Sequence, residues 1–345
     1  MKILYVLESA GLWGGVKNVF DQARALAVEG HEVIIKAKQG DHNWYPHPLR
    51  IDYVGDLDHA LRPEEDKPDV VVATFWKTVF PAMKIGCPRT FHLCQGYEGD
   101  FAEYADIRPD IEEAYRVPIT KITNGNWLNR ILEKHFGHKS FKMYIAPPIV
   151  DTTIFKPLSS EVPESGRPET ERQRVLVVGL FGISWKAIDD ALRAAESLRR
   201  EFPRIWVVRV SPVDTSAKEK SLFPIDEYHA GLTPGEMARI YRTSDIFLSS
   251  SHAQEGFGLP FAEALACGVP SVVTDILPYR SHDAVQDYAL FVPEGDPEAM
   301  ADAAMTILDD ENLRKRLRAR GPEIIDRKYR GDIIAKTLEK IFQEG

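Results

Sequence analysis

KILYVLESAGLWGGVKNVFDQARALAVEGHEVIIKAK, residues 2–38, is the stretch that decides the fold of this chain. Residues 2–8 form a short apolar run rich in β-formers, which predicts a buried parallel strand. After a glycine-bearing loop, the apolar residues of segment 16–30 recur on one helical stripe, and Gly30 ends the helix. Residues 31–38 predict the next strand. This is a βαβ unit, so we expect the first half of the chain to be a doubly wound α/β domain.

The same alternation continues along the chain and restarts once. Further strands of the first half are expected at 69–75, 89–95 and 121–124. After residue 173 the strand–turn–helix pattern begins again. The expected elements there are strands 174–182, 205–210, 245–250 and 270–275 and helices 187–202, 234–244 and 260–268.

The length of 345 residues suits two domains of roughly 150 residues each. Residues 158–173 are rich in Pro, Ser and Glu and have almost nothing to bury, which is typical of an interdomain linker. We therefore place the first domain at 1–157 and the second at 174–330. The amphipathic C-terminal segment 331–345 is expected to form a helix that packs back on the first domain.

Composition limits the classes of function. The net charge of -9 argues against a general nucleic-acid binder, which needs a positive field over the phosphates. The three cysteines, Cys87, Cys94 and Cys267, lack the paired spacing of a disulfide framework or zinc site. The first strand begins at Lys2 and no apolar run approaches the length of a membrane span. We expect a cytoplasmic protein, with the inner face of the membrane as the alternative location.

The segment EGFGLPFAEALACGVPSVVTD, residues 255–275, carries the chemistry. Pro260 stands where a helix would begin, and proline suits a first helical position because its missing N–H would be unpaired there. The free N–H groups and positive dipole of such a helix end favour a phosphate. Glu255 precedes this end and Glu263 lies one turn inside the helix, where its carboxylate could accept from ribose hydroxyls.

At these residues the chain resembles the retaining GT-B glycosyltransferases that carry a Glu-x7-Glu signature. The resemblance covers nearly the whole chain. Besides Glu255 and Glu263, it rests on Gly14-Gly15 and on the segments 146–157, 240–250 and 289–308. The resemblance implies a GT-B fold, in which two Rossmann-like doubly wound domains face a central cleft.

The resemblance also implies roles for single residues. Glu255 would contact the donor sugar on its reacting face, and Glu263 would bind the ribose. A cation beside the departing diphosphate stabilises the charge that develops there, which is the role implied for Lys186. The first-domain loop would contribute Gly15. The backbone amides implied to hold sugar hydroxyls and phosphate belong to Phe257, Gly258 and Leu259.

The chain departs from the family pattern in three places. The family usually has an arginine after the glycine that ends the first strand of the second domain, but Leu180 and Phe181 follow Gly179 here. Pro148-Ile149 replaces the usual Asn-Gly. A histidine often lies near the reacting centre at the end of a first-domain strand. Here the candidates are His92 and Gln95, and we place Gln95, as the better positioned, beside Glu255 among the catalytic residues.

The resemblance implies transfer of a hexosyl unit from a nucleotide diphosphate sugar, with retention and without a metal or other cofactor. A UDP-sugar is favoured as donor and a GDP-sugar comes next. The acceptor hydroxyl would belong to a glycan, a lipid-linked or a small-molecule acceptor. Sequence does not decide between a covalent intermediate and a same-face displacement.

Two other functions are open. A catalytically degenerate nucleotide-sugar or glycan binding protein would keep the fold without turnover, and the missing arginine and Gln95 favour it. An NAD-dependent dehydrogenase needs G-x-G-x-x-G after a strand, and the glycines of 11–15 and 179–182 have the wrong spacing. Segment 126–142 combines an apolar stripe with basic residues that would permit peripheral membrane contact, but we favour packing of the stripe on the sheet.

Overall fold

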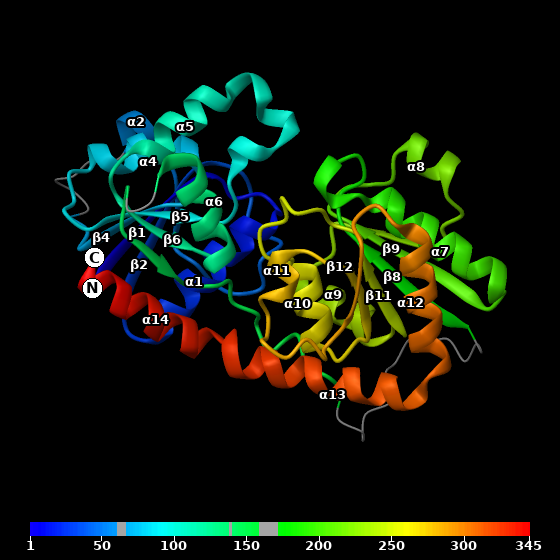
Figure 1. Ribbon diagram of the computed structural model, residues 1–345. Coiled ribbons are helices and arrows are strands. Elements are labelled where there is room, and N and C mark those ends of the chain that lie inside the picture. Colours follow the sequence, from blue (N-terminus) through cyan, green and yellow to red (C-terminus); the bar gives the residue numbers. More distant parts are fainter. Residues whose placement is uncertain (61–66, 138–139, 159–171) are drawn as a thin grey trace. The chain divides into compact units, whose positions relative to one another are not determined.

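The computed structural model divides into two compact units (Figure 1). The first comprises Met1–Ile149 and Tyr329–Gly345, and the second comprises Val150–Lys328. The structure describes residues 1–60, 67–137, 140–158 and 172–345. Most of the expected linker, 158–173, therefore lies outside the described residues.

Seven parallel strands form the sheet of the first unit. They are β1 (Lys2–Ser9), β2 (Glu32–Gln39), β3 (Ile51–Tyr53), β4 (Val70–Ala73), β5 (Thr90–Cys94), β6 (Thr120–Thr123) and β7 (Met143–Ile145). Their order is β3-β2-β1-β4-β5-β6-β7 and every pairing is parallel. The order reverses between β1 and β4, so the expected doubly wound topology is confirmed for this unit.

Helices cover both faces of this sheet, as a parallel sheet requires. They are α1 (Gly14–Val28), α2 (Leu57–Ala60), α4 (Trp76–Lys84), α5 (Arg108–Arg116), α6 (Asn126–Phe136) and α14 (Gly331–Glu344), with the 3-10 turns η1 (Glu98–Asp100) and η2 (Ala102–Ile107). Alternate residues of β1 point to opposite faces. Tyr5 joins the core beneath α1 and α14, whereas Val6 joins the core beneath α4.

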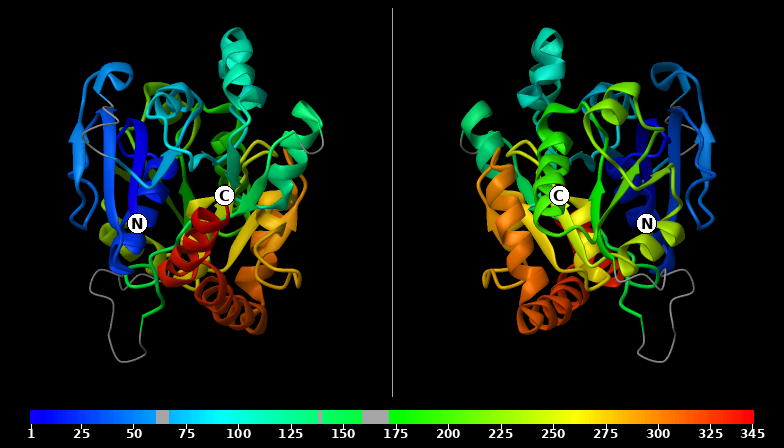
Figure 2. Two further views of the ribbon diagram at one scale, coloured as in Figure 1. Left: turned by 90° about the vertical axis from the view of Figure 1, so that its left-hand side faces the viewer. Right: turned by 90° about the vertical axis from the view of Figure 1, so that its right-hand side faces the viewer.

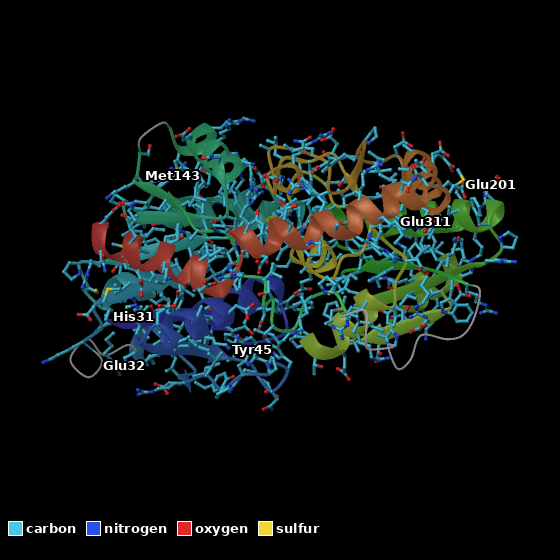
Figure 3. The ribbon with its side chains drawn as sticks, turned by 90° about the horizontal axis from the view of Figure 1, so that it is seen from below. His31, Glu32, Tyr45, Met143, Glu201 and Glu311 are labelled. Atoms are coloured by element: carbon cyan, nitrogen blue, oxygen red, sulfur yellow. The ribbon has the colours of Figure 1, made fainter. Side chains whose placement is uncertain are left out.

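The C-terminal helix α14 packs in the core of the first unit. Its Leu338 and Phe342 share a buried cluster with Phe20 of α1, and the two helices lie side by side (Figure 1). The ring of His31, labelled in Figure 3, hydrogen-bonds Glu339 of α14 at 2.7 Å. Both chain ends, marked N and C in Figure 2, therefore belong to this unit.

The second unit repeats the plan with six parallel strands. They are β8 (Gln173–Val178), β9 (Ile205–Ser211), β10 (Glu227–Ala230), β11 (Ile246–Ser249), β12 (Ser271–Thr274) and β13 (Leu290–Val292). Their order is β10-β9-β8-β11-β12-β13, which reverses between β8 and β11. The doubly wound topology is confirmed here too.

The helices of the second unit place its core. They are α7 (Ile188–Glu201), α8 (Ala217–Leu222), α9 (Pro234–Arg242), α10 (Leu259–Ala266), α11 (Leu277–Arg280), α12 (Pro297–Asp309) and α13 (Glu311–Lys328), with the 3-10 turn η3 (Ser184–Lys186). Leu192 of α7 and Ala304 of α12 pack with Val177 and Leu248 of the sheet. α10 contacts β11, β12, α9 and α13 outside this cluster.

Candidate donor site and its partner loops

The strongest site candidate lies where the second sheet reverses its strand order. Lys186 follows β8 and Glu255 follows the neighbouring strand β11, so both leave the carboxyl edge of the sheet at its switch point. Loops diverge there in doubly wound folds and leave room for a ligand. The Lys186 Nζ lies 2.6 Å from the Glu255 Oε2. The structure thus brings together two side chains that are 69 positions apart in the chain.

Glu255 is buried, and both of its carboxylate oxygens accept hydrogen bonds. Its Oε2 also accepts from the Ser251 hydroxyl at 2.9 Å, and its Oε1 accepts from the Gly256 amide at 3.1 Å. Burial alone would raise the pKa of this carboxyl, but the Lys186 charge and the three hydrogen bonds lower the pKa below its ordinary value. Glu255 is therefore a carboxylate at neutral pH, held in one orientation.

The two loops that carry this pair are hydrogen-bonded to each other. The Ser250 hydroxyl donates to the Ala187 carbonyl at 2.6 Å, and the His252 amide donates to the Trp185 carbonyl at 2.8 Å. Ala187 has φ 44° and ψ 40°, a left-handed conformation that a residue with a Cβ adopts only when its surroundings hold it there. Lys186 thus approaches Glu255 from a fixed backbone rather than from a free loop.

The start of α10 follows immediately after this pair. Gly258 is the N-cap with φ 78°, and a Cβ there would lie 2.2 Å from the Tyr279 ring, so the position requires glycine. The helix begins at Leu259, one residue before the expected start, so Pro260 is its second residue. Proline still fits, because every N–H of the first turn lacks an intrahelical acceptor.

The other predicted donor-site residues of the second unit, Phe257, Leu259 and Glu263, are buried. The Phe257 ring packs edge-on against the His282 ring, with 4.9 Å between the ring centroids. The ring is therefore engaged in packing, and a ligand at this position would be held by the backbone amide of Phe257. Glu263 is 6% exposed, and its Oε2 accepts from the Tyr241 hydroxyl at 3.3 Å. The predicted contact of Glu263 with a ribose stays a prediction.

An arginine does lie near Gly179, where the family arginine is missing, but it is the buried Arg209 of β9. This fully buried residue of β9 donates from Nη2 to the Gly179 carbonyl at 2.6 Å and from Nε to Glu219 at 2.7 Å. The charge of its guanidinium is balanced by Glu219, and its hydrogen bond to Gly179 fixes the loop that follows β8. Arg209 therefore supports the strand end where the family places a ligand-facing arginine, without replacing that arginine as a phosphate ligand.

In the first unit the structure brings Gly15 and Gln95 together. The Gln95 Nε2 donates to the Gly15 carbonyl at 3.0 Å, and its Oε1 accepts from Asn18 at 3.0 Å. His92, the other candidate, is fully buried on β5 with its ring against Tyr115. Burial, with a smaller effect of Lys121, lowers the pKa of His92 well below its ordinary value. His92 is thus a neutral core residue, and Gln95 lies at the carboxyl end of the strand.

Helix α6 carries the apolar stripe for which the sequence permits either packing on the sheet or peripheral membrane contact. Trp127, Leu128 and Leu132 are buried in a cluster with Tyr97 and Tyr115. The stripe therefore packs within the first unit, as we favoured. Among the helices that the structure describes, none is long and apolar enough to cross a membrane.

Sequence reasoning missed several residues that support the predicted ones within each unit. Ser251 and Tyr279 fix Glu255 and Gly258, and Asn18 fixes Gln95. No motif marks them, because each acts through a contact that only the fold creates. Within the described ranges, no group of three His, Cys, Asp or Glu side chains could hold a metal ion. The expectation that no metal or cofactor is needed stays a prediction.

Comparison with known proteins agrees with these features. The model of the family glycosyl transferases group 1 matches residues 160–324, nearly all of the second unit. The chain is 25% identical over 199 residues to the phosphatidyl-myo-inositol mannosyltransferase of Mycolicibacterium smegmatis, covering 56% of this chain and 50% of the relative. It is 26% identical over 230 residues to the D-inositol 3-phosphate glycosyltransferase of Xylanimonas cellulosilytica, covering 62% and 54%. The chain thus spans about half the length of these curated relatives.

Solved structures match over the whole chain. HepE of Anabaena, in complex with UDP-glucose, aligns with a TM-score of 0.82 at 13% identity and covers 100% of both chains. Sucrose-phosphate synthase of Thermosynechococcus elongatus aligns with a TM-score of 0.76 at 16% identity, covering 100% of this chain and 99% of the synthase. At these identities the likeness shows the fold, and it is the GT-B fold. Residues 160–324 are therefore similar to the glycosyl transferases group 1 family, and the chain has the GT-B fold that the sequence predicts.

Proposed function

We propose that this chain transfers a hexosyl unit from a nucleotide diphosphate sugar to an acceptor hydroxyl, with retention at the anomeric carbon and without a metal. The observation that carries the proposal is the pair of Lys186 and Glu255 at the switch point of the second sheet, beside the start of α10. The match to the group 1 family over residues 160–324 supports it.

The geometry suits the departure of a nucleoside diphosphate. As the bond between the anomeric carbon and the β-phosphate oxygen breaks, negative charge grows on the diphosphate. The Lys186 ammonium and the positive dipole at the start of α10 supply positive charge there in a fixed arrangement. Arrival of the donor would draw Lys186 from Glu255 toward the phosphate and release the carboxylate to bind a sugar hydroxyl.

A UDP-sugar is the favoured donor and a GDP-sugar the next. The structure of HepE was solved with UDP-glucose, and that neighbour aligns over the full length of both chains. We propose the acceptor to be a hydroxyl of a glycan, a lipid-linked or a small-molecule acceptor. The two curated relatives described above are named for inositol-containing acceptors, which makes polyols of this kind the first acceptors to try.

A turnover experiment tests the proposal. The protein is incubated with UDP-glucose, UDP-N-acetylglucosamine or GDP-mannose, with and without inositol phosphates, and proton NMR follows the anomeric signals. We expect nucleoside diphosphate release and a first-formed product with the α configuration of the donor. In Glu255→Gln the rate should fall about 10²–10³-fold, the usual cost of removing one group that stabilises a transition state.

The results separate the alternatives. A first-formed β product would contradict retention. Tight binding of a nucleotide sugar with neither transfer nor slow hydrolysis would instead favour the catalytically degenerate binding protein. One observation favours this binding protein: both polar atoms of the Gln95 side chain are already hydrogen-bonded, to Gly15 and to Asn18.

A further inference from the structure

A partly buried chain of hydrogen bonds ends at Gly15, in the first turn of α1. The Ile149 amide donates to the Asn18 Oδ1 at 3.3 Å, and the Asn18 Nδ2 donates to the Gln95 Oε1 at 3.0 Å. The Gln95 Nε2 then donates to the Gly15 carbonyl at 3.0 Å. Asn18 is fully buried, so its amide serves these internal partners.

The direction of this chain is fixed at both ends. A backbone amide such as that of Ile149 can only donate, so it must meet the oxygen of the Asn18 side chain. That leaves the Asn18 nitrogen to face Gln95, which must present its oxygen in return. The Gln95 nitrogen is then left for the Gly15 carbonyl, which can only accept. A reversed amide at either position would set two acceptors or two donors against each other.

Two neighbouring side-chain amides, those of Asn124 and Gln22, hold the same two residues. The Asn124 side chain donates to the Gln95 carbonyl at 2.8 Å and so anchors its backbone after β5. Gln22 donates to the Asn18 Oδ1 at 3.4 Å and accepts from the Tyr5 hydroxyl at 3.2 Å. A Cβ added at Gly15 would lie 3.1 Å from the Gln95 Nε2, so the absence of a side chain there allows the close approach.

The first turn of α1 depends on this contact. Trp13 precedes the helix in an extended conformation, and its side chain makes no capping hydrogen bond in the described structure. None of the residues 14–17 is acidic, so the turn has neither a cap nor a favourable negative charge to hold it. The Gln95 amide reaches this turn from the end of β5 and hydrogen-bonds the Gly15 carbonyl.

We propose that Gln95 is a positioning residue, whose amide holds the Gly15 carbonyl and so fixes the first turn of α1, which carries the predicted donor-binding residue Gly15, with Asn18 and the Ile149 amide setting its orientation. This inference rests on the proposed glycosyl transfer. It changes the predicted role of Gln95, from a group that acts on the reacting centre to one that acts through Gly15.

Two isosteric substitutions test the inference. In Gln95→Glu a carboxylate oxygen faces the Gly15 carbonyl, and in Asn18→Asp a carboxylate oxygen faces the Gln95 Oε1. Each places two acceptors together at neutral pH. A protonated carboxyl has one donor and one acceptor oxygen, as an amide has a donor and an acceptor, so lowering the pH should restore the chain of hydrogen bonds.

Two readouts are measured from pH 5 to pH 8. The first is kcat and KM for donor turnover, normalised to wild type at each pH. The second is hydrogen exchange of the segment 13–20, which needs no activity. At pH 8 we expect both variants to lose at least tenfold in kcat/KM and to exchange at least fivefold faster in this segment. Both effects should shrink as the pH falls. Gln343→Glu makes the same chemical change at an exposed position of α14 and should match wild type.

Asn18→Asp separates positioning from direct catalysis, because the buried Asn18 cannot reach a ligand. If Gln95→Glu loses turnover while Asn18→Asp keeps both turnover and slow exchange, Gln95 acts on substrate and the inference is wrong. Unchanged exchange in both variants would also overturn it. Should either variant fail to fold, Gln95→Met tests the same loss of hydrogen bonds without introducing a charge. A wild-type protein without turnover would defeat the proposed function, while exchange would still decide the inference.

Discussion

Lys186 and Glu255 form an ion pair at the carboxyl edge of the second sheet, so a phosphate at the proposed donor site would have to compete with this pair. The side chain of Glu255 is 9% exposed and that of Lys186 is 24% exposed. Removing the lysine would leave a carboxylate buried beside Ser251 without its countercharge. The same residue that we expect to assist the departing diphosphate therefore also stabilises the fold around Glu255.

Lys186→Met tests this dual role through stability. The free energy of unfolding at pH 7 should fall by about 1–3 kcal/mol. This is less than for a fully buried pair, because the Lys186 side chain is partly exposed to solvent. The lowered pKa of Glu255 contributes stability above the ordinary carboxyl pKa, which is lost as pH falls through the folded-state pKa. In the variant, burial instead raises the pKa of Glu255. The difference from wild type in urea unfolding should thus shrink between pH 7 and pH 4.

Lys218→Met, on the exposed face of α8, is the matched control and should unfold like wild type at every pH. An equal loss of stability at pH 4 and pH 7 in Lys186→Met would show that the ion pair does not set the charge of Glu255.

Gly258 is the second position where one residue decides the local geometry. Gly258→Ala would place a Cβ at φ 78° and 2.2 Å from the Tyr279 ring, which is held by the Ser249 hydroxyl at 2.6 Å. We expect a loss of about 1–3 kcal/mol from backbone strain, with more from the displaced ring. Gly235→Ala, inside α9 with nothing within 4 Å, should be neutral or stabilising. Thermal melts of the two variants make the comparison, and equal melting temperatures would contradict this geometry.

At the scale of elements, the long periodic segments were predictable and the short ones were not. The segment 2–38 and the strands at 205–210 and 245–250 have enough apolar residues in sequence to reveal their type. Strands such as β3 and β13 have three residues each, and they exist because a neighbouring strand pairs with them. A pattern read within one segment cannot contain that information.

The candidate site shows the same division. Glu255, Gly258 and Glu263 share one segment with a recognisable spacing, so sequence alone singled them out. The family resemblance singled out Lys186 as a diphosphate ligand, but its contact with Glu255 joins the ends of two strands and was not predicted. Ser251 and Asn18 could not be predicted, because their partners come from long-range packing.

The turn between β5 and α5 supplies a prediction of its own. The Tyr115 hydroxyl lies 2.8 Å from the Gly96 carbonyl and 2.6 Å from the Glu98 Oε2. One phenolic proton cannot fully serve two acceptors, so a proton on Glu98 completes the arrangement. Burial raises the pKa of Glu98 to about 7, against a smaller opposing effect of the Tyr115 hydrogen bond.

A carboxyl with a raised pKa destabilises the fold as it ionises. The folded state holds this proton up to about pH 7, whereas the unfolded chain loses it near its ordinary value. The free energy of unfolding should therefore fall as pH rises from 5 to 8, by on the order of 2 kcal/mol. Glu98→Gln keeps the donor and should remove this part of the pH dependence. Identical slopes for wild type and variant in urea unfolding would refute the assignment.

At the scale of the whole molecule, the chain leaves the first unit after Ile149 and returns to it at Tyr329. The returning helix α14 completes the first core, although it follows the second unit in sequence. The stability of the first unit therefore depends on residues at the far end of the chain. The expected cleft between the domains stays a prediction, as does the location of the protein in the cell.

Leu338→Ala tests the dependence on α14. Leu338 is fully buried among residues of β1 and α1, and its truncation should cost about 2–5 kcal/mol. Leu222→Ala removes the same atoms from a side chain that is 50% exposed in the second unit and should cost far less. Hydrogen exchange should report the loss for Leu338→Ala in segments of the first unit, such as 2–28. Loss confined to α14 would show that the first core stands without it.

The most direct test of the central claim is a thermal-shift titration with UDP, GDP, ADP and dTDP and their sugars. It compares wild type with Lys186→Met and Glu263→Ala, each against its own melting temperature without ligand. A ligand that binds the folded state raises the melting temperature by mass action. We predict that a uridine or guanosine diphosphate sugar stabilises wild type and that both substitutions weaken the shift. If none of these nucleotides stabilises the folded wild-type protein, or if all three proteins shift equally, Lys186 and Glu263 do not form a donor site.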